Sequence, residues 1–382
     1  MHGTIESGFS VEMRGLDDLA VFADALRALH GRVLAPNVFY EPAFMAAALP
    51  VFGHDVVAGL VWHRAMPKRL AGFFPVAIAR RRYGLTLPVL TGWTHPFGPY
   101  GMPLIDRDCS EAAVAAWLDH IAADAGLPKL LLMPYLPAAG AAAFEAALRE
   151  RGGRSAEFGY HARAMLRPDN GRNGYLDVAI PHKKRKELRR QRKRLAGLGA
   201  VTSTTIRTSP ELRSALAEFL ALEASGWKGR LGTAAKANDH IRCFLEAAVT
   251  ALAAEGKAGI TRLALDGRAI AALVTLRSGA TAWSWKIAYD ETLARYSPGV
   301  QVLLDATQEL LADASVARAD SCAAPHHPMI DHIWRERLPL SDRLMSVVPC
   351  NAVAFAGICA LETARRTAID GARALRSLVR GR

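Results

Sequence analysis

The sequence predicts an α/β fold in which one unit of strand, strand, helix and strand occurs twice. The chain has 382 residues, which is enough for two domains with a core each. Hydrophobic residues make up 51% of the chain, a share typical of a globular protein. The similarity between the two halves lies in the order of the elements rather than in individual residues.

Hydrophobic periodicity gives the expected elements of each half. In the first half we expect a helix at 17–30, strands at 56–62, 73–80 and 85–90, a Gly/Pro-rich loop at 91–103, a helix at 111–125, a strand at 129–133 and an alanine-rich helix to Arg151. In the second half we expect strands at 259–265, 269–277 and 282–289, a helix from Gly299 and a strand at 316–319.

The loop Asp169-Asn-Gly-Arg-Asn-Gly places a domain boundary near residues 170–175. We therefore expect an N-terminal domain at 1–170, a C-terminal domain at 171–350 and a basic amphipathic tail at 351–382.

The positive charge of the chain is concentrated in two segments. The net charge is +12, and nine Lys or Arg residues with a single acid, Glu187, lie between Lys183 and Arg194. The segment 351–382 carries six arginines against Glu362 and Asp370. These two segments account for the whole excess, so the basicity is local.

Cysteine usage and the N-terminus favour the cytoplasm. The five cysteines are scattered without a Cys-x-x-Cys pair, and they predict neither a disulfide framework nor a zinc site. The first 14 residues do not have the form of a signal peptide. No uncharged run is long and apolar enough for a confident membrane span.

The segment from Trp283 to Leu311 is typical of a strand, a tight turn and a helix. Ser297 is placed to cap the helix, Pro298 suits its first turn, and Gly299 lets a ligand approach the backbone. A helix start with free N–H groups near Arg295 favours a pyrophosphate. The alternative is a well-capped helix after a strand.

Three motifs are distinctive in their order and spacing. They are Lys-Lys-Arg-Lys-Glu-Leu-Arg-Arg-Gln-Arg-Lys-Arg-Leu at 183–195, Glu-Ala-Ser-Gly-Trp-Lys-Gly-Arg at 223–230 with Gly-Thr-Ala at 232–234, and Lys-Ile-Ala-Tyr-Asp-Glu at 286–291 with Tyr-Ser-Pro-Gly-Val at 296–300. Together they resemble the GNAT-superfamily acyltransferases of the cellulose-biosynthesis type, relatives of the Fem aminoacyltransferases. Asn-Val-Phe-Tyr-Glu-Pro-Ala-Phe at 37–44 resembles the N-terminal landmark of that family.

The resemblance implies two tandem GNAT-like domains, each a mixed sheet flanked by helices. It implies that the second domain binds acyl-CoA or acetyl-CoA as a co-substrate, with no permanently bound cofactor. Pantetheine would lie against the strand at 282–289, and the pyrophosphate would bind at Arg295, Tyr296, Ser297, Gly299 and Val300. In the first domain Asp106, Asp108 and Glu111 precede the corresponding helix. Carboxylates there would repel a pyrophosphate, so we expect no CoA in this domain.

The chain departs from the family pattern in two places. The usual pyrophosphate signature is present only in a relaxed form, from Arg295 to Gly299, which leaves the acyl carrier open. Relatives carry an Asp, a Gly-rich turn and a Lys after the last core strand. This chain instead has Asp320-Ser-Cys-Ala-Ala-Pro-His-His-Pro-Met-Ile-Asp331-His332.

The histidines of this segment are candidates for the general base. His326 or His327, oriented by Asp331, would remove the proton of an attacking ammonium. The alternative is a surface turn. No metal site is expected, because the close spacing of these histidines and His332 gives no standard ligand geometry.

Three further charged residues are site candidates. Glu223, near the end of a helix, is either a proton acceptor or a charge on the helix face. Lys286 and Asp320 lie on strands expected to border the cleft, where a charge needs a partner or a ligand. Trp283 and Trp285 share one strand face and are expected either in the core or along an acyl chain.

The basic helix, which begins after Pro181, and the tail leave alternatives open. The helix either presents a solvated face, binds an anionic membrane surface or binds RNA; RNA ranks lowest because no aromatic residues interleave with the cations. The tail is either an interfacial anchor or a helix packed on the second domain.

The leading hypothesis is an acyl-CoA-dependent transferase that acylates an amine, or a hydroxyl, of an acceptor related to the envelope, a lipid or a polysaccharide. We expect it in the cytoplasm, and peripheral binding at the inner face of the membrane is a further hypothesis. The alternatives are a tRNA-dependent aminoacyl transfer of the Fem type and a non-catalytic envelope-assembly protein with a decayed GNAT core. Nothing in the sequence identifies the acceptor or the acyl length.

Overall fold

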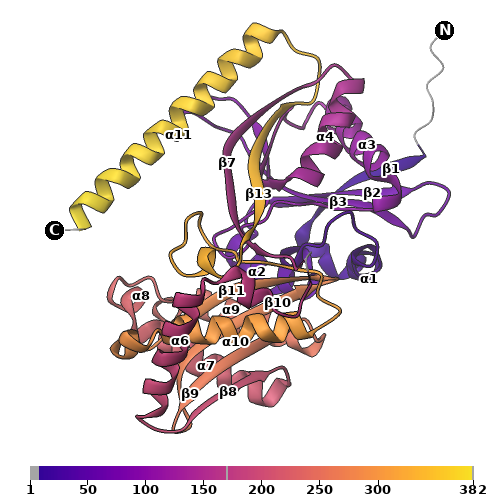
Figure 1. Cartoon of the computed structure of the whole chain (residues 1–382). Coiled ribbons are helices and arrows are strands. Elements are labelled where there is room, and N and C mark those ends of the chain that lie inside the picture. Colours follow the sequence, from indigo (N-terminus) through magenta and orange to yellow (C-terminus); the bar gives the residue numbers. More distant parts are fainter. Residues whose placement is uncertain (1–7, 169–170, 381–382) are drawn as a thin grey trace, which may run out of the picture. The chain divides into compact units, whose positions relative to one another are not determined.

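The computed structural model describes residues 8–168 and 171–380, which form two compact units (Figure 1). Unit 1 comprises the described residues of Met1–Ala35, Asp55–His161 and Leu340–Arg382, and unit 2 those of Pro36–His54 and Ala162–Pro339. The units therefore interleave along the chain, whereas the sequence analysis expected one boundary near 170–175. Asp169 and Asn170 of that boundary lie outside the described residues. The separate roles of an N-terminal and a C-terminal domain stay a prediction.

Unit 1 contains these elements: β1 (Phe9–Gly15), α1 (Leu19–His30), β2 (Val56–His63), β3 (Leu70–Ala79), β4 (Val89–Gly92), β5 (Leu104–Ile105), α3 (Ser110–Ala123), β6 (Leu130–Pro137), α4 (Ala138–Glu150) and α11 (Ala352–Arg380). Unit 2 contains these elements: α2 (Pro42–Phe52), α5 (Tyr175–Ala179), α6 (His182–Ala196), β8 (Val201–Ile206), α7 (Ser209–Ser225), α8 (Trp227–Arg230), α9 (Asp239–Ala254), β9 (Ala258–Leu265), β10 (Arg268–Ser278), β11 (Thr281–Tyr289), α10 (Pro298–Ala312) and β12 (Arg318–Asp320). Two strands, β7 (Arg154–Leu166) and β13 (Glu336–Ser346), contribute residues to both units.

Most expected elements are present within a few residues of their expected ends. The expected strand at 85–90 begins only at Val89. Tyr83 and Gly84 both have positive φ, and the backbones of Arg82 and Leu85 bond to each other across them, so this part of the chain is a tight turn. The sequence analysis did not anticipate β1, α2, β5, β7, α5, β8, α9 and β13.

The two units repeat one order of strand pairing. In unit 1 the order is β1-β2-β3-β4-β6-β13, and in unit 2 it is β8-β9-β10-β11-β12-β7. In each series three antiparallel pairs are followed by one parallel pair, β4 with β6 or β11 with β12, and then by an antiparallel pair. A helix, α3 or α10, connects the strands of each parallel pair, as a parallel connection requires. This repetition confirms the expected duplication of one α/β unit.

Helices cover the sheet of unit 2 and enclose its core. The helix α10 lies across β9, β10 and β11 (Figure 1), and α7 also packs on these strands. The segment 36–54 adds Phe39 and Phe44, whose rings lie 6.1 Å from Trp283 and 5.7 Å from Trp285, between centroids. Both tryptophans are buried, so core packing is the correct interpretation of this pair. The family landmark at 37–44 therefore belongs to unit 2, although the sequence analysis placed it in the N-terminal domain.

The helix α11 packs on unit 1 by a stripe that includes Phe355, Ile358 and Glu362. The Glu362 carboxylate has no exposed surface and accepts hydrogen bonds from Arg82 at 2.8 Å and from Arg366 at 2.7 Å. Burial alone would raise the pKa of Glu362, but the hydrogen bonds of Arg82 and the charges of Arg82 and Arg366 hold it below its usual value. The tail is thus a packed helix over its first half, and it packs on unit 1, whereas the alternative offered from the sequence was packing on the second domain. Among the described residues no helix is long and apolar enough to cross a membrane.

Candidate functional site

The strand β11 carries an irregularity where it pairs with β10. Lys286 pairs with Val274 and Ser284 pairs with Thr275, which leaves Trp285 as an extra residue in a β-bulge. On its other edge β12 pairs only with Thr281–Trp283 and then ends. Within the described chain the second half of β11 therefore has no partner in β12, and its edge is able to offer backbone groups to an extended ligand.

After β11 the chain enters a short 3₁₀ helix, Glu291–Tyr296, before α10 begins. Ser297 lies between them with a φ of +52° and makes no side-chain cap, so its expected role as a helix cap is wrong. Pro298 occupies the first turn as expected. The N–H groups of Gly299 and Val300 have no acceptor in the described part of the chain. Two free amides and the positive end of the helix dipole favour an anion here.

Arg295 adds a cation to this turn. Its guanidinium carbon lies 4.7 Å from the ring centre of Tyr296, and the side chain is exposed. Within the described residues Arg295 has no carboxylate partner. Its charge is thus available to a ligand, while Tyr296 is buried in the core of unit 2.

Packing explains why position 299 is a glycine, a reason that the sequence did not reveal. A Cβ atom at this position would lie 2.8 Å from Cδ1 of Tyr289 and 3.2 Å from Cε1. The ring of Tyr289, at the end of β11, therefore occupies the space of the missing side chain. This packing explains the glycine without any ligand, so Gly299→Asp would disturb the fold as well as an anion site.

Glu223 and Lys286 are brought together although 63 residues separate them. Lys286 Nζ lies 3.3 Å from Glu223 Oε1, and the Ala235 N–H donates to Glu223 Oε2 at 2.9 Å. Their side chains are 2% and 14% exposed, respectively. Low exposure keeps water away from the pair and strengthens its attraction.

A small cavity of about 30 Å³ adjoins this pair, and Glu223, Trp227, Ala288 and Glu291 line part of it. Glu291 accepts hydrogen bonds from the Trp227 N–H and from Arg230, both at 2.7 Å. These contacts hold the pKa of Glu291 below its usual value, the Arg230 bond having the largest effect. The sequence analysis missed Glu291, because no local pattern predicts a partner more than sixty positions away.

Asp320 has a buried partner and is separate from the Glu223–Lys286 pair. Arg163 Nη2 donates to its Oδ2, and the Cys322 N–H donates to its Oδ1 at 3.0 Å. Arg163 comes from β7, which the sequence analysis did not expect. A buried carboxylate with these donors stabilises the end of β12.

The two histidines lie on a loop after β12. His326 is exposed and has a φ of +59°. His327 is half-buried, and its Nδ1 accepts the Met329 N–H at 3.3 Å. Burial lowers the pKa of His327 below 6.5, and the charge of Asp331 opposes this shift. The Asp331 N–H donates to the His327 carbonyl oxygen at 3.3 Å, but within the described residues no hydrogen bond joins the Asp331 carboxylate to either imidazole, so the expected orientation by this carboxylate is not seen.

In unit 1 two arginines compensate the charge of Asp106, one of the carboxylates before α3. Asp106 is fully buried and bonds to Arg32 at 2.7 Å and to Arg69 at 2.9 Å. The repulsion that we expected between Asp106 and a pyrophosphate is therefore weaker than the sequence implied. Among the described residues, one group of possible metal ligands comprises His63, Asp106 and Cys109. The two guanidinium groups on Asp106 argue against a cation at this place.

Known proteins with a similar sequence or fold indicate the family of this site. Residues 182–327 match a family described as an acetyltransferase (GNAT) domain. FemX matches with 10% identity over 86% of this chain and 96% of its own, with a TM-score of 0.57. A conserved protein of unknown function from Bacteroides thetaiotaomicron matches with 12% identity over 88% of this chain and 99% of its own, with a TM-score of 0.56.

The C-terminal domain of a protein described as a lysylphosphatidylglycerol synthetase, from Agrobacterium fabrum, is also similar. It matches with 12% identity over 89% of this chain and 95% of its own, with a TM-score of 0.51. No curated protein matches the sequence. Likeness at these identities establishes the fold alone. Together with the matched domain, it shows that this chain has the GNAT fold of the Fem-related acyltransferases.

Proposed function

We propose that unit 2 catalyses the transfer of an acyl group from acyl-CoA to an amine of an acceptor related to the envelope. The observation that carries the proposal is a combination of three features within the described residues: the edge of β11 that β12 leaves open, the free amides of Gly299 and Val300, and Arg295 without a carboxylate partner. An extended pantetheine fits a strand edge, and a pyrophosphate fits a helix start with a nearby cation. CoA itself would be a substrate and not a resident cofactor.

In the proposed reaction the amine nitrogen attacks the thioester carbonyl. The new C–N bond forms, the C–S bond breaks, and the CoA thiolate leaves with the electron pair and takes up the second proton, which the nitrogen loses after the attack. Backbone N–H groups near the bulge at Trp285 would polarise the carbonyl oxygen. One proton of the ammonium must be removed before attack, and Glu223 or His327 would accept it. The amide product needs no further co-reactant.

Glu223 and His327 differ in what supports each as the base. Glu223 lies beside the cavity at the end of β11, but Lys286 and the Ala235 amide already bond to its carboxylate. His327 has a lowered pKa, which keeps it neutral near pH 7, but its acceptor nitrogen Nδ1 bonds to the Met329 N–H and must leave that contact to take a proton. Lys286 would position Glu223, and Asp320 would support the end of β12 through Arg163. A hydroxyl acceptor remains a variant of the same chemistry.

Titration calorimetry with CoA tests the proposal. Arg295→Gln should weaken CoA binding about tenfold or more, because a charge-assisted contact to a phosphate is lost. Arg213→Gln is the matched control, since Arg213 is an exposed arginine on α7 of the same unit. Equal affinity of the wild type and Arg295→Gln would remove the anion assignment of the turn. A thiol-release assay with acyl-CoAs of several lengths and a panel of amines then measures transfer.

A second candidate is aminoacyl transfer from tRNA, which the resemblance to the Fem aminoacyltransferases implies. The exposed cations of α6, such as Lys183, Lys184 and Arg190, favour a polyanion in general. Replacing acyl-CoA by aminoacyl-tRNA in the transfer assay separates the two donors. Absence of both activities would favour a non-catalytic role in envelope assembly.

We also propose peripheral, salt-sensitive association with anionic membrane at the cytoplasmic face, through α6. The tail contributes less than expected, because the first half of α11 is packed on unit 1. Attraction of about 1 kcal/mol for each exposed cation near the surface supports the role of α6.

A further inference from the structure

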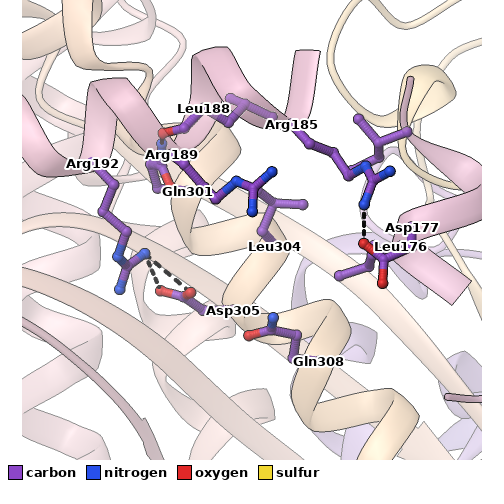
Figure 2. Close-up of a pocket in the computed structure, with 11 residues that line it drawn as sticks. Leu176, Asp177, Arg185, Leu188, Arg189, Arg192, Gln301, Leu304, Asp305 and Gln308 are labelled. Carbon is purple, nitrogen blue, oxygen red and sulfur yellow. Dashed lines mark hydrogen bonds and ion pairs between the residues drawn. The ribbon is translucent and has the colours of Figure 1, made fainter. Parts of the chain in front are cut away.

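A groove of about 390 Å³ lies between α6 and α10 in unit 2, with α5 at one end (Figure 2). On α6 its lining residues Arg185, Leu188, Arg189 and Arg192 follow the spacing of one helix face. On α10 the lining residues follow the same spacing; they are Gln301, Leu304, Asp305 and Gln308. Two facing helix stripes therefore form the walls, and the volume falls within the range of small-molecule pockets.

Polar contacts hold the groove open in advance of any ligand. The amide nitrogen of Gln301, which is 2% exposed, donates to the Leu188 carbonyl oxygen at 2.9 Å. Arg192 Nη1 bonds to both oxygens of Asp305, at 3.1 and 3.0 Å (Figure 2). These contacts tie α6 to α10, so a ligand would not need to order the walls on binding.

The floor of the groove is apolar. Leu176 comes from α5, Leu188 from α6 and Leu304 from α10, and all three line the same space. Leu188 is buried, whereas Leu176 and Leu304 keep part of their surface exposed to the groove. A hydrocarbon or another uncharged part of a ligand would remove this surface from water.

The charges on the walls leave one cation uncompensated. Arg185 is paired with Asp177, and Arg192 is paired with Asp305. Arg189 has no ion-pair partner among the described residues, and Figure 2 shows its side chain extending toward Leu304. A guanidinium over an apolar floor complements an anionic group attached to an apolar body.

We propose that this groove binds an amphiphilic phosphate ester, with its phosphate on Arg189 and its uncharged part over Leu188 and Leu304. The groove lining does not include Arg295, Gly299 or Val300, so binding of a lipid here is independent of the transfer chemistry, whereas binding of CoA here rests on the proposed function. The phosphate ester has two natural sources, a membrane phospholipid headgroup and the 3′-phosphate of CoA. Both present the same chemistry to the groove.

Calorimetric titration of the full-length protein with octyl phosphate, below its micellar concentration, tests the proposal. Octyl phosphate should bind more tightly than butyl phosphate by about tenfold or more, since each buried methylene adds affinity. Arg189→Gln should weaken octyl phosphate binding by about tenfold or more, because it removes the phosphate contact. Leu304→Ala should reduce the difference between the octyl and butyl chains.

Arg190→Gln is the matched control. It removes the same charge from the neighbouring position of α6, but Arg190 does not line the groove. Its affinity should stay within about twofold of the wild type, since its charge acts only at long range. Equal weakening in the Arg189 and Arg190 variants would show a general charge effect and overturn the proposal. Equal affinity for octyl and inorganic phosphate would overturn it as well.

Competition against octyl phosphate separates the two sources. Displacement by dihexanoyl phosphatidic acid, with none by CoA, assigns the groove to a lipid. Displacement by CoA but not by dephospho-CoA assigns it to the 3′-phosphate. Failure of both competitors overturns the assignment to a natural phosphate ester. The lipid result does not depend on whether the Arg295 turn binds CoA, because Arg295 does not line the groove. The result for the 3′-phosphate rests on the proposed function, and repeating the competition with Arg295→Gln distinguishes failure of the turn from failure of the groove.

Discussion

Replacing Gly299 with alanine should destabilise unit 2 and leave CoA affinity nearly unchanged. The new Cβ would lie 2.8 Å from Tyr289 Cδ1, whereas ordinary contact begins near 3.4 Å, so the ring or the helix start must move by about 0.6 Å. Overpacking of this kind costs about 1–3 kcal/mol. In a domain of about 200 residues, 1 kcal/mol lowers Tm by about 2–4 °C, which predicts a total decrease of about 2–12 °C.

Differential scanning calorimetry of the single and double variants isolates the contact between Gly299 and Tyr289. Tyr289→Leu removes the ring, so Gly299→Ala should cost less in that background than in the wild type. A coupling of about 0.5 kcal/mol or more between the two positions is expected for side chains in contact. If Gly299→Ala keeps the wild-type Tm but abolishes CoA binding, the glycine serves ligand approach and our structural reason is wrong.

Three other predictions concern stability, catalysis and surface charge. Glu362→Gln should destabilise unit 1 by about 3 kcal/mol at pH 7, because it leaves buried guanidinium charge uncompensated. Since the folded pKa of Glu362 lies below the usual 4.5, this contribution is present above pH 4.5 and is lost as the pH falls below it; urea unfolding at pH 7 and pH 3 measures the difference. His327→Ala should lower turnover by about 10²–10⁴ without changing CoA affinity, and the acid limb of kcat/KM should have a pKa below 6.5 in the wild type. Wild-type rates across a pH series in both His326→Ala and His327→Ala would move the base to Glu223 or to a water. Lys183→Glu with Lys184→Glu should reduce co-sedimentation with anionic vesicles at low salt, and an unchanged pellet would exclude α6 as the contact.

Local patterns in the sequence determined the regular elements that have strong periodicity. The strand at 282–289, the turn and the helix from Gly299 are present because aromatic and β-branched residues favour a strand and Pro298 favours a helix start. The basic helix also depends mainly on its own residues, because its buried side chains are only Leu188 and Leu195 among those described. Such features depend on neighbours within a few residues, which is why one sequence is sufficient to predict them.

The strands β7 and β13, which the sequence analysis did not predict, show which elements local patterns are unable to reveal. Their sequences contain charged residues, and β13 also contains Pro339, so neither resembles a buried strand. They become strands because partner strands are available, β12 for β7 and β6 for β13. Pairing partners far away in the sequence, rather than propensity, decide their conformation.

Only the tertiary structure decided which charged groups meet. Glu223 was a candidate, but its contact with Lys286 spans 63 residues, and Asp320 met Arg163 across 157 residues. Glu362 of the tail bonds to Arg82, 280 positions away, so the segment that the sequence offered as a membrane anchor is docked on unit 1 in its first half. The sequence by itself determined the two α/β repeats, the basic helix and the turn before α10. The partners of buried charges, the reason for Gly299 and the groove beneath Arg189 required the packing of distant elements, because a charge in a protein core is defined by what surrounds it.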